Sequence, residues 1–187
     1  MKKLIYWITF TILLATACQN SNVLFQANTD DWVIVGDANW KFMNNELIGT
    51  LESGVGFVMT KRTFNNFILE IDFNPDSTIN SGVFIRCKNN SISPTDCYEI
   101  NIWDLHPNQD YRTGAIVMKD SPLAIVKTIN KWNSYKIRCE NDHIQVWING
   151  VITTDIYDDV LIEGYIGLQA AGSGVIKFRN ITIHTLK

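Results

Sequence analysis

Two neighbouring stretches of the sequence carry side chains suited to recognising a polar ring. Phe84 and Arg86 stand two residues apart in the first stretch, and the second alternates Glu99, Asn101 and Trp103. Alternate residues of an extended strand point to the same side, so a hairpin of these strands would gather all five on one face. Planar polar groups suit sugar hydroxyls, and aromatic rings suit the C–H face of a sugar. The alternative is an outward salt bridge between Arg86 and Glu99, with Trp103 covering the sheet.

Further candidate residues follow these strands. Asp104 and His106 come directly after Trp103, and a histidine can serve as acid or base near neutral pH, although a loop histidine is often simply solvated. Residues 104–130 alternate weakly and contain Pro and several charges, and a loop of this length is usually functional or mobile. Lys127 in this loop is a candidate substrate-binding residue. Gln169 in a glycine-rich strand end could reach the same face and bind substrate, or it could simply bond to the backbone.

The elements that must position these residues are strands. Apolar residues alternate with polar ones along many short segments, which predicts half-buried β-strands. Asn149-Gly150 is a strong hairpin-turn dipeptide, and Glu140-Asn141-Asp142 predicts a second tight hairpin. Many short antiparallel strands favour an all-β sandwich or jelly roll. The alternating apolar positions are Phe67, Leu69, Ile71, Phe73, Val83, Ile85, Tyr98, Ile100, Ile102, Tyr135, Ile137, Cys139, Ile144, Val146, Ile148, Ile176 and Phe178.

The N-terminus has the pattern of an export signal. Residues 1–17 contain two lysines, an apolar run too short to span a bilayer and then small residues, which is the order of a secretory signal. Cys18 follows and resembles the lipidated cysteine of a bacterial lipoprotein, whereas plain secretion would end in cleavage after Ala17. We expect a tether over residues 18–28, a single domain over 29–187, and a lipid-anchored cell-envelope location, at the outer membrane or facing the periplasm.

Three cysteines remain after Cys18, and an odd number cannot all pair within one chain. Cys87 and Cys97 lie at facing ends of two predicted strands and could form a disulfide in an oxidising compartment. The alternative is three buried free thiols, and the sequence favours neither. The formal net charge is −3 with no basic patch, which argues against a nucleic-acid partner.

Several motifs together resemble the bacterial 3-keto-disaccharide hydrolase family, also described as 3-keto-glucoside lyase/hydratase domains. The resemblance runs from about Trp32 to Leu186. It rests on the segments Asn80-Ser81-Gly82-Val83-Phe84-Ile85-Arg86, Tyr98-Glu99-Ile100-Asn101-Ile102-Trp103-Asp104, Thr113-Gly114-Ala115, Lys131-Trp132-Asn133-Ser134-Tyr135, Val146-Trp147-Ile148-Asn149-Gly150, Gly164-Tyr165-Ile166-Gly167-Leu168-Gln169 and Phe178-Arg179-Asn180-Ile181.

The resemblance implies a concanavalin A-like jelly roll that acts on glycosides oxidised to a ketone at sugar C3. Such a ketone acidifies the proton on C2, so the site needs a base and a group that stabilises an enolate. Glu99 is the candidate base, and Arg86 or a divalent metal is the candidate stabiliser. His106 or Asp104 is the candidate acid for the leaving group. Asn101, Trp103, Lys127 and Gln169 would hold the sugar.

The chain departs from the family pattern at two places. Asn101 stands where Gln is common, and Ala170 and Ala171 stand where a His is common. A non-catalytic carbohydrate-binding lipoprotein and a structural envelope domain are therefore the alternatives to an enzyme. A calcium site at the loop carboxylates Asp155, Asp158 and Asp159 has no supporting spacing, and the sequence leaves any metal unassigned.

Overall fold

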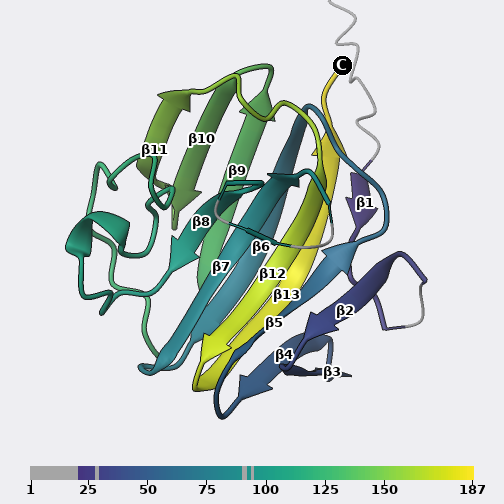
Figure 1. The fold of residues 1–187 in the computed structure, drawn as a ribbon, viewed down its shortest axis with the longest axis vertical. Helices are drawn as coiled ribbons and strands as arrows, with labels where there is room; N and C mark the ends of the chain where they lie inside the picture. Colours follow the sequence, from purple (N-terminus) through teal and green to yellow (C-terminus); the bar gives the residue numbers. More distant parts are fainter. Residues whose placement is uncertain (1–20, 28–29, 90–91, 94) are drawn as a thin grey trace, which may run out of the picture.

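Two antiparallel sheets pack face to face in the computed structural model, which describes residues 21–27, 30–89, 92–93 and 95–187 (Figure 1). The predicted signal and Cys18 lie outside the described residues. The elements in chain order are β1 (Ser21–Val23), β2 (Trp32–Gly36), β3 (Asn39–Met43), β4 (Glu46–Leu51), β5 (Val55–Thr60), β6 (Phe67–Pro75), β7 (Ile79–Cys87), β8 (Tyr98–Ile102), the 3-10 helix η1 (Gln109–Tyr111), β9 (Asn133–Glu140), β10 (His143–Ile148), β11 (Val151–Tyr157), β12 (Tyr165–Gly172) and β13 (Gly174–Thr185).

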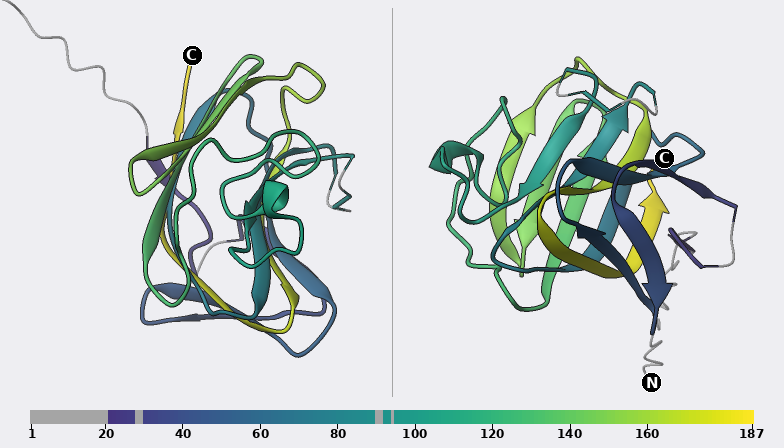
Figure 2. Two further views of the ribbon diagram at one scale, coloured as in Figure 1. Left: turned by 90° about the vertical axis from the view of Figure 1, so that its left-hand side faces the viewer. Right: turned by 60° about the horizontal axis from the view of Figure 1, so that its bottom comes forward.

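The larger sheet has eight strands and the smaller has five. The larger sheet has the order β11-β10-β9-β6-β13-β4-β3, with β1 also paired to β13, and the smaller has the order β2-β5-β12-β7-β8. The left view of Figure 2 sees the two layers edge on, with the long loop in front of them. This arrangement confirms the predicted all-β jelly roll. Within the described ranges, no helix has the length and apolar character needed to cross a membrane.

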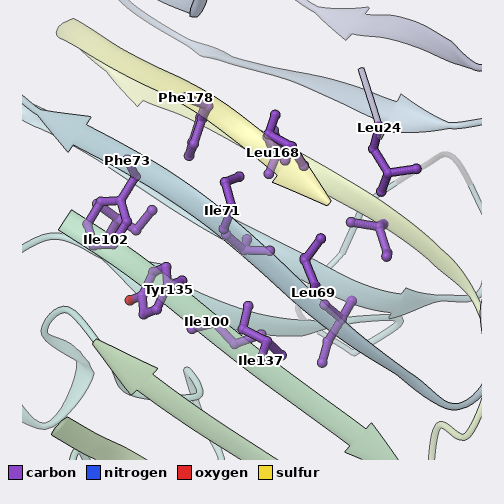
Figure 3. Packing of buried hydrophobic residues seen from close by; sticks show 14 of the residues in the cluster. Leu24, Leu69, Ile71, Phe73, Ile100, Ile102, Tyr135, Ile137, Leu168 and Phe178 are labelled. Carbon is purple, nitrogen blue, oxygen red and sulfur yellow. The ribbon is translucent and has the colours of Figure 1, made fainter. Parts of the chain in front are cut away.

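The core fills the space between the two sheets and uses the predicted alternating positions (Figure 3). Phe73 of β6 stacks on Tyr135 of β9 with ring centroids 4.5 Å apart. The Tyr135 hydroxyl donates a hydrogen bond of 2.6 Å to the backbone oxygen of Asn101. Burying side chains of this size contributes about 1.5–3 kcal/mol each. The Tyr135 contact also fixes β8, the strand that carries Glu99, against the opposite sheet.

Both predicted hairpins are present. Asn149 and Gly150 have φ values of 52° and 81°, the left-handed conformation that a two-residue turn between β10 and β11 requires. Asn141, with φ 52°, makes the turn between β9 and β10. These turns set the register of the larger sheet.

The segment expected to be a tether joins the domain earlier than predicted. Ser21 to Val23 form β1 on the edge of β13, and Leu24 and Phe25 are buried in the core. Burial of these two apolar side chains stabilises the attachment of the segment. Ser21 to Phe25, which the prediction assigned to the tether, therefore belong to the folded domain.

Of the two alternatives for the cysteines, the structure contains the disulfide. Cys87 at the end of β7 is bonded to Cys97, just before β8. Cys139 is a free, buried thiol, and burial raises its pKa to about 12. The disulfide closes the connection between the two strands that carry most candidate residues.

Candidate functional site

The outer face of the five-stranded sheet gathers the predicted polar set around a glycine. Gly82 of β7 pairs with Gln169 of β12 on one side and with Asn101 of β8 on the other. Their chain neighbours Val83, Leu168 and Ile100 point into the core, so Gln169 and Asn101 point outward. Position 82 carries no side chain, and the Phe84 ring approaches to 3.3 Å from where its Cβ atom would lie.

Glu99 also lies over Gly82. Its Cγ would lie 3.3 Å from a Cβ atom at position 82. Among the described residues its carboxylate has no hydrogen-bond partner, and it is only partly exposed. Burial, which disfavours the charged form, raises the pKa of Glu99 to about 7. The carboxyl group is thus poised to exchange a proton near neutral pH.

Three amide oxygens on this face lack donors. Asn101 Oδ1, Gln169 Oε1 and Asn80 Oδ1 are buried and have no hydrogen-bond partner within the described part of the chain. Asn101 is held in place because its Nδ2 donates to the backbone oxygen of Tyr111. Buried polar atoms are normally satisfied, so three free acceptors beside a carboxylate point to a ligand rich in hydroxyl donors.

Aromatic side chains border one end of the polar set. Trp103 follows β8 and is partly exposed, and its ring meets the His106 ring edge to face at 4.6 Å. The His106 ring also contacts Tyr111 at 5.7 Å. His106 Nδ1 lies 2.7 Å from the backbone oxygen of Asn108 and 3.0 Å from its backbone nitrogen, and the tautomer of the ring decides which of the two it bonds. The other ring nitrogen, Nε2, has no partner among the described residues, so it remains available to a ligand.

The structure does not place Arg86 with Glu99, and that prediction is wrong. Arg86 has φ 53° and sits where the register of β7 against β12 shifts between Tyr165 and Gly167. A bulge of this kind re-aims a side chain. Arg86 is fully buried and donates to the backbone oxygens of Leu161 at 3.0 Å and Asn65 at 3.4 Å. Its role is structural.

Asp104 and Lys127 also lie apart from the polar set. The two carboxylate oxygens of Asp104 accept the backbone N–H of Thr128 at 2.7 Å and its hydroxyl at 2.8 Å. Asp104 therefore joins the two ends of the long loop. Its predicted role as the acid for the leaving group is replaced by this structural role. Lys127 is exposed and lines a separate cavity with Arg112.

Two of the three loop carboxylates considered for calcium, those of Asp155 and Asp158, have partners elsewhere. Asp155 contacts His143 at 2.6 Å, and Asp158 contacts Lys119 at 2.8 Å. Within the described ranges, no group of three or more His, Cys, Asp or Glu gathers as a metal site would require. The candidate site is built from one carboxylate and neutral amides.

Sequence reasoning missed Asn80, Gly82 and Tyr111. The alternation through Val83 already placed Asn80 and Gly82 on the Phe84 side, so a strict reading would have found them. The hydrogen bond from Asn101 to the Tyr111 backbone has no sequence signal, because it depends on the path of the long loop.

Several solved structures share this fold. A glycosyl hydrolase candidate from Parabacteroides distasonis is 26% identical, with a TM-score of 0.77 over 89% of this chain and 100% of its own. The carbohydrate-binding module CBM66 of Bacillus subtilis is 19% identical, with a TM-score of 0.67 over 86% of this chain and 99% of its own. A β-glucanase of Bacillus licheniformis is 16% identical, with a TM-score of 0.59 over 92% of this chain and 100% of its own. The last two likenesses show the fold alone.

The fold is one that glycoside hydrolase-like and carbohydrate-binding jelly rolls share. A family model for the 3-keto-alpha-glucoside-1,2-lyase-like domain matches residues 20–184. The chain belongs to this family. No match was found among curated proteins.

Proposed function

We propose that this protein is an enzyme that cleaves 3-keto glycosides, with Glu99 as the base. The observation that carries the proposal is the position of Glu99, which reaches over Gly82 without a hydrogen-bond partner among the described residues. Its pKa near 7 allows it to accept a proton at neutral pH and to hold it. Its neighbours Asn101 and Gln169 supply polar groups for the sugar.

The chemistry begins at C2 of the oxidised sugar. Glu99 takes the C2 proton, and the electrons of that C–H bond form an enolate with the C3 oxygen. The enolate then expels the C1 oxygen, which takes a proton as the C1–O bond breaks and leaves a C1=C2 double bond conjugated to the ketone. Water adds at C1 and C2 regains a proton, so the net reaction is hydrolysis.

Two side chains are the candidates for the supporting roles. The Gln169 amide replaces Arg86 as donor to the enolate oxygen, because it lies on the same face as Glu99 and its N–H group has no partner among the described residues. An oriented donor of this kind is worth about 2.7–4 kcal/mol of transition-state stabilisation. His106 is the candidate acid for the leaving oxygen through Nε2.

The test uses the protein without residues 1–18, which contains every described strand. We expect release of reducing sugar from 3-keto glucosides, exchange of the C2 proton with deuterated water, and a kcat/KM that rises with pH through about 7. Glu99→Gln should lower both rates by about 10²–10⁴-fold. Glu70→Gln is the matched control, since Glu70 is exposed on the other sheet. Full turnover by Glu99→Gln would refute the assignment.

A second candidate function is carbohydrate binding without catalysis. The observation that favours it is Ala171, which pairs with Asn80 on the candidate face, close to where the family commonly has a His. This reading expects saturable binding of unoxidised glycans and no release from any 3-keto glycoside. It also expects Glu99→Gln to change the affinity for the glycan, while neither the wild type nor the variant shows any turnover.

A further inference from the structure

A cavity of about 570 Å³ lies within the long loop that follows β8. Its polar lining includes Arg112, Lys127 and Lys131, and its apolar lining includes Leu105 and Ile129. None of these residues takes part in the chemistry described above. The loop occupies the left-hand side of Figure 1, next to β8.

The charge of this cavity is positive. Three cationic side chains face one carboxylate, that of Asp104. Both oxygens of that carboxylate already accept hydrogen bonds from Thr128, so they compete weakly for the cations. No salt bridge joins Arg112, Lys127 or Lys131 to an acidic group in the part of the chain that the structure describes.

Arg112 supplies an independent sign of a missing ligand. Its side chain lines the cavity and only 9% of the residue is exposed. One terminal nitrogen donates to Gln109 Oε1 at 3.1 Å, but the buried Nε–H has no acceptor among the described residues. A guanidinium edge offers two parallel N–H groups that match a carboxylate or sulfate. An oxyanion bound there would supply the acceptor that the protein lacks.

Two residues that line the cavity are next to candidate residues in the sequence. Asp104 directly follows Trp103, and Arg112 directly follows Tyr111. Trp103 and Tyr111 both contact the ring of His106. Gln109, which lines the cavity, donates to the backbone oxygen of His106 at 2.6 Å. The cavity and the His106 ring therefore belong to the same segment of the loop.

We propose that the cavity binds the anionic group of an acidic carbohydrate, a carboxylate or a sulfate ester. The apolar side chains of Leu105 and Ile129 would cover the sugar ring that bears it. The inference rests on the proposed function only in taking the ligand to be a carbohydrate. It names the substrate class as acidic glycosides, which neither the family nor the fold specifies.

The test compares matched probes on the protein without residues 1–18. Calorimetry and amide NMR shifts would follow methyl glucuronoside, its neutral methyl ester, and the 6-sulfate of methyl glucoside. We expect the charged probes to bind about tenfold more tightly than the ester at low salt, with the advantage fading as salt increases. Lys127→Met with Lys131→Met should remove the preference. Lys41→Met, an exposed lysine on β3, should leave it intact.

The outcomes separate this inference from the proposed function. A preference for the glucuronoside alone assigns the cavity to carboxylates, and a preference for the sulfate alone assigns it to sulfate esters. Equal binding of acid and ester overturns the inference, as does a preference that survives in the double variant. Turnover of neutral 3-keto glucosides would uphold the proposed function in either case. A lysine-dependent preference for the charged probes without any turnover would support the cavity as an anion-binding site and would refute the proposed enzymatic function.

Discussion

Ionisation of the buried Glu99 carboxyl group lowers the stability of the folded protein. In the unfolded chain its carboxyl has an ordinary pKa near 4.5, and burial raises it to about 7 in the folded protein. The folded state therefore binds more protons between these values. The resulting stabilisation is fully present below pH 4.5 and is lost as the pH rises through 7.

This linkage predicts how stability changes in a variant. Between pH 5 and 8, wild type should lose up to about 3 kcal/mol of unfolding free energy relative to Glu99→Gln, and less where water screens the partly exposed group. Urea unfolding of both proteins across this range measures the difference. If the unfolding free energies of wild type and Glu99→Gln changed in parallel with pH, the carboxylate would not be desolvated. The control variant Glu70→Gln should show the same pH dependence as wild type.

Arg86 shows where residue-level prediction fails. Alternation placed it on the face of Phe84, and the neighbours Val83 and Ile85 are buried as predicted. One extra residue at the bulge moves the guanidinium to the other side. Nothing in the residue types signals the bulge, because it is set by the pairing of β7 with β12. Glu99, Asn101 and Gln169 share a face as predicted, since their strands pair without interruption there.

The long loop after β8 holds its shape through a few polar contacts. Its ends are joined by Asp104 and Thr128, and Ile116 bridges to Ile100 at the edge of the sheet. The sequence marked residues 104–130 as a functional or mobile loop but could not give its path. That path depends on single hydrogen bonds, which have no periodic pattern.

Removal of the Asp104 contacts should loosen the loop as a unit. Asp104→Ala loses two charge-assisted hydrogen bonds and should cost about 1.5–3 kcal/mol. It should also speed amide exchange across residues 104–130 more than in the strands. Hydrogen exchange by mass spectrometry measures this. Asp110→Ala is the control, because Asp110 is exposed in the same loop. Unchanged exchange in the loop would contradict the role assigned to Asp104.

At the scale of the whole molecule, we propose that the protein is exported and anchored by a lipid at Cys18. The signal-like residues 1–17 and the cysteine after them motivate this proposal, and a disulfide between Cys87 and Cys97 suits an oxidising compartment. More than one acyl chain would hold the protein stably at a membrane surface.

The anchor predicts a change in location. Cys18→Ser should move the protein from the membrane fraction to the soluble fraction of the envelope and should abolish incorporation of labelled fatty acid. Ser21→Ala, three residues further on, should behave as wild type. A membrane-bound, unlabelled Cys18→Ser protein would mean that another part of the chain makes the attachment.

The short strand β1 pairs with the last strand, with Ser21 opposite His184. The two ends of the described domain therefore leave it side by side. Such a domain can be inserted into a loop of another protein, or circularly permuted by a short linker, with little disturbance of its core. A reporter fused after Lys187 would lie next to any tether at the N-terminus and would not report on the candidate face. Labels that measure distances to the candidate face should instead be attached to the exposed loop, at Leu105 or Met118.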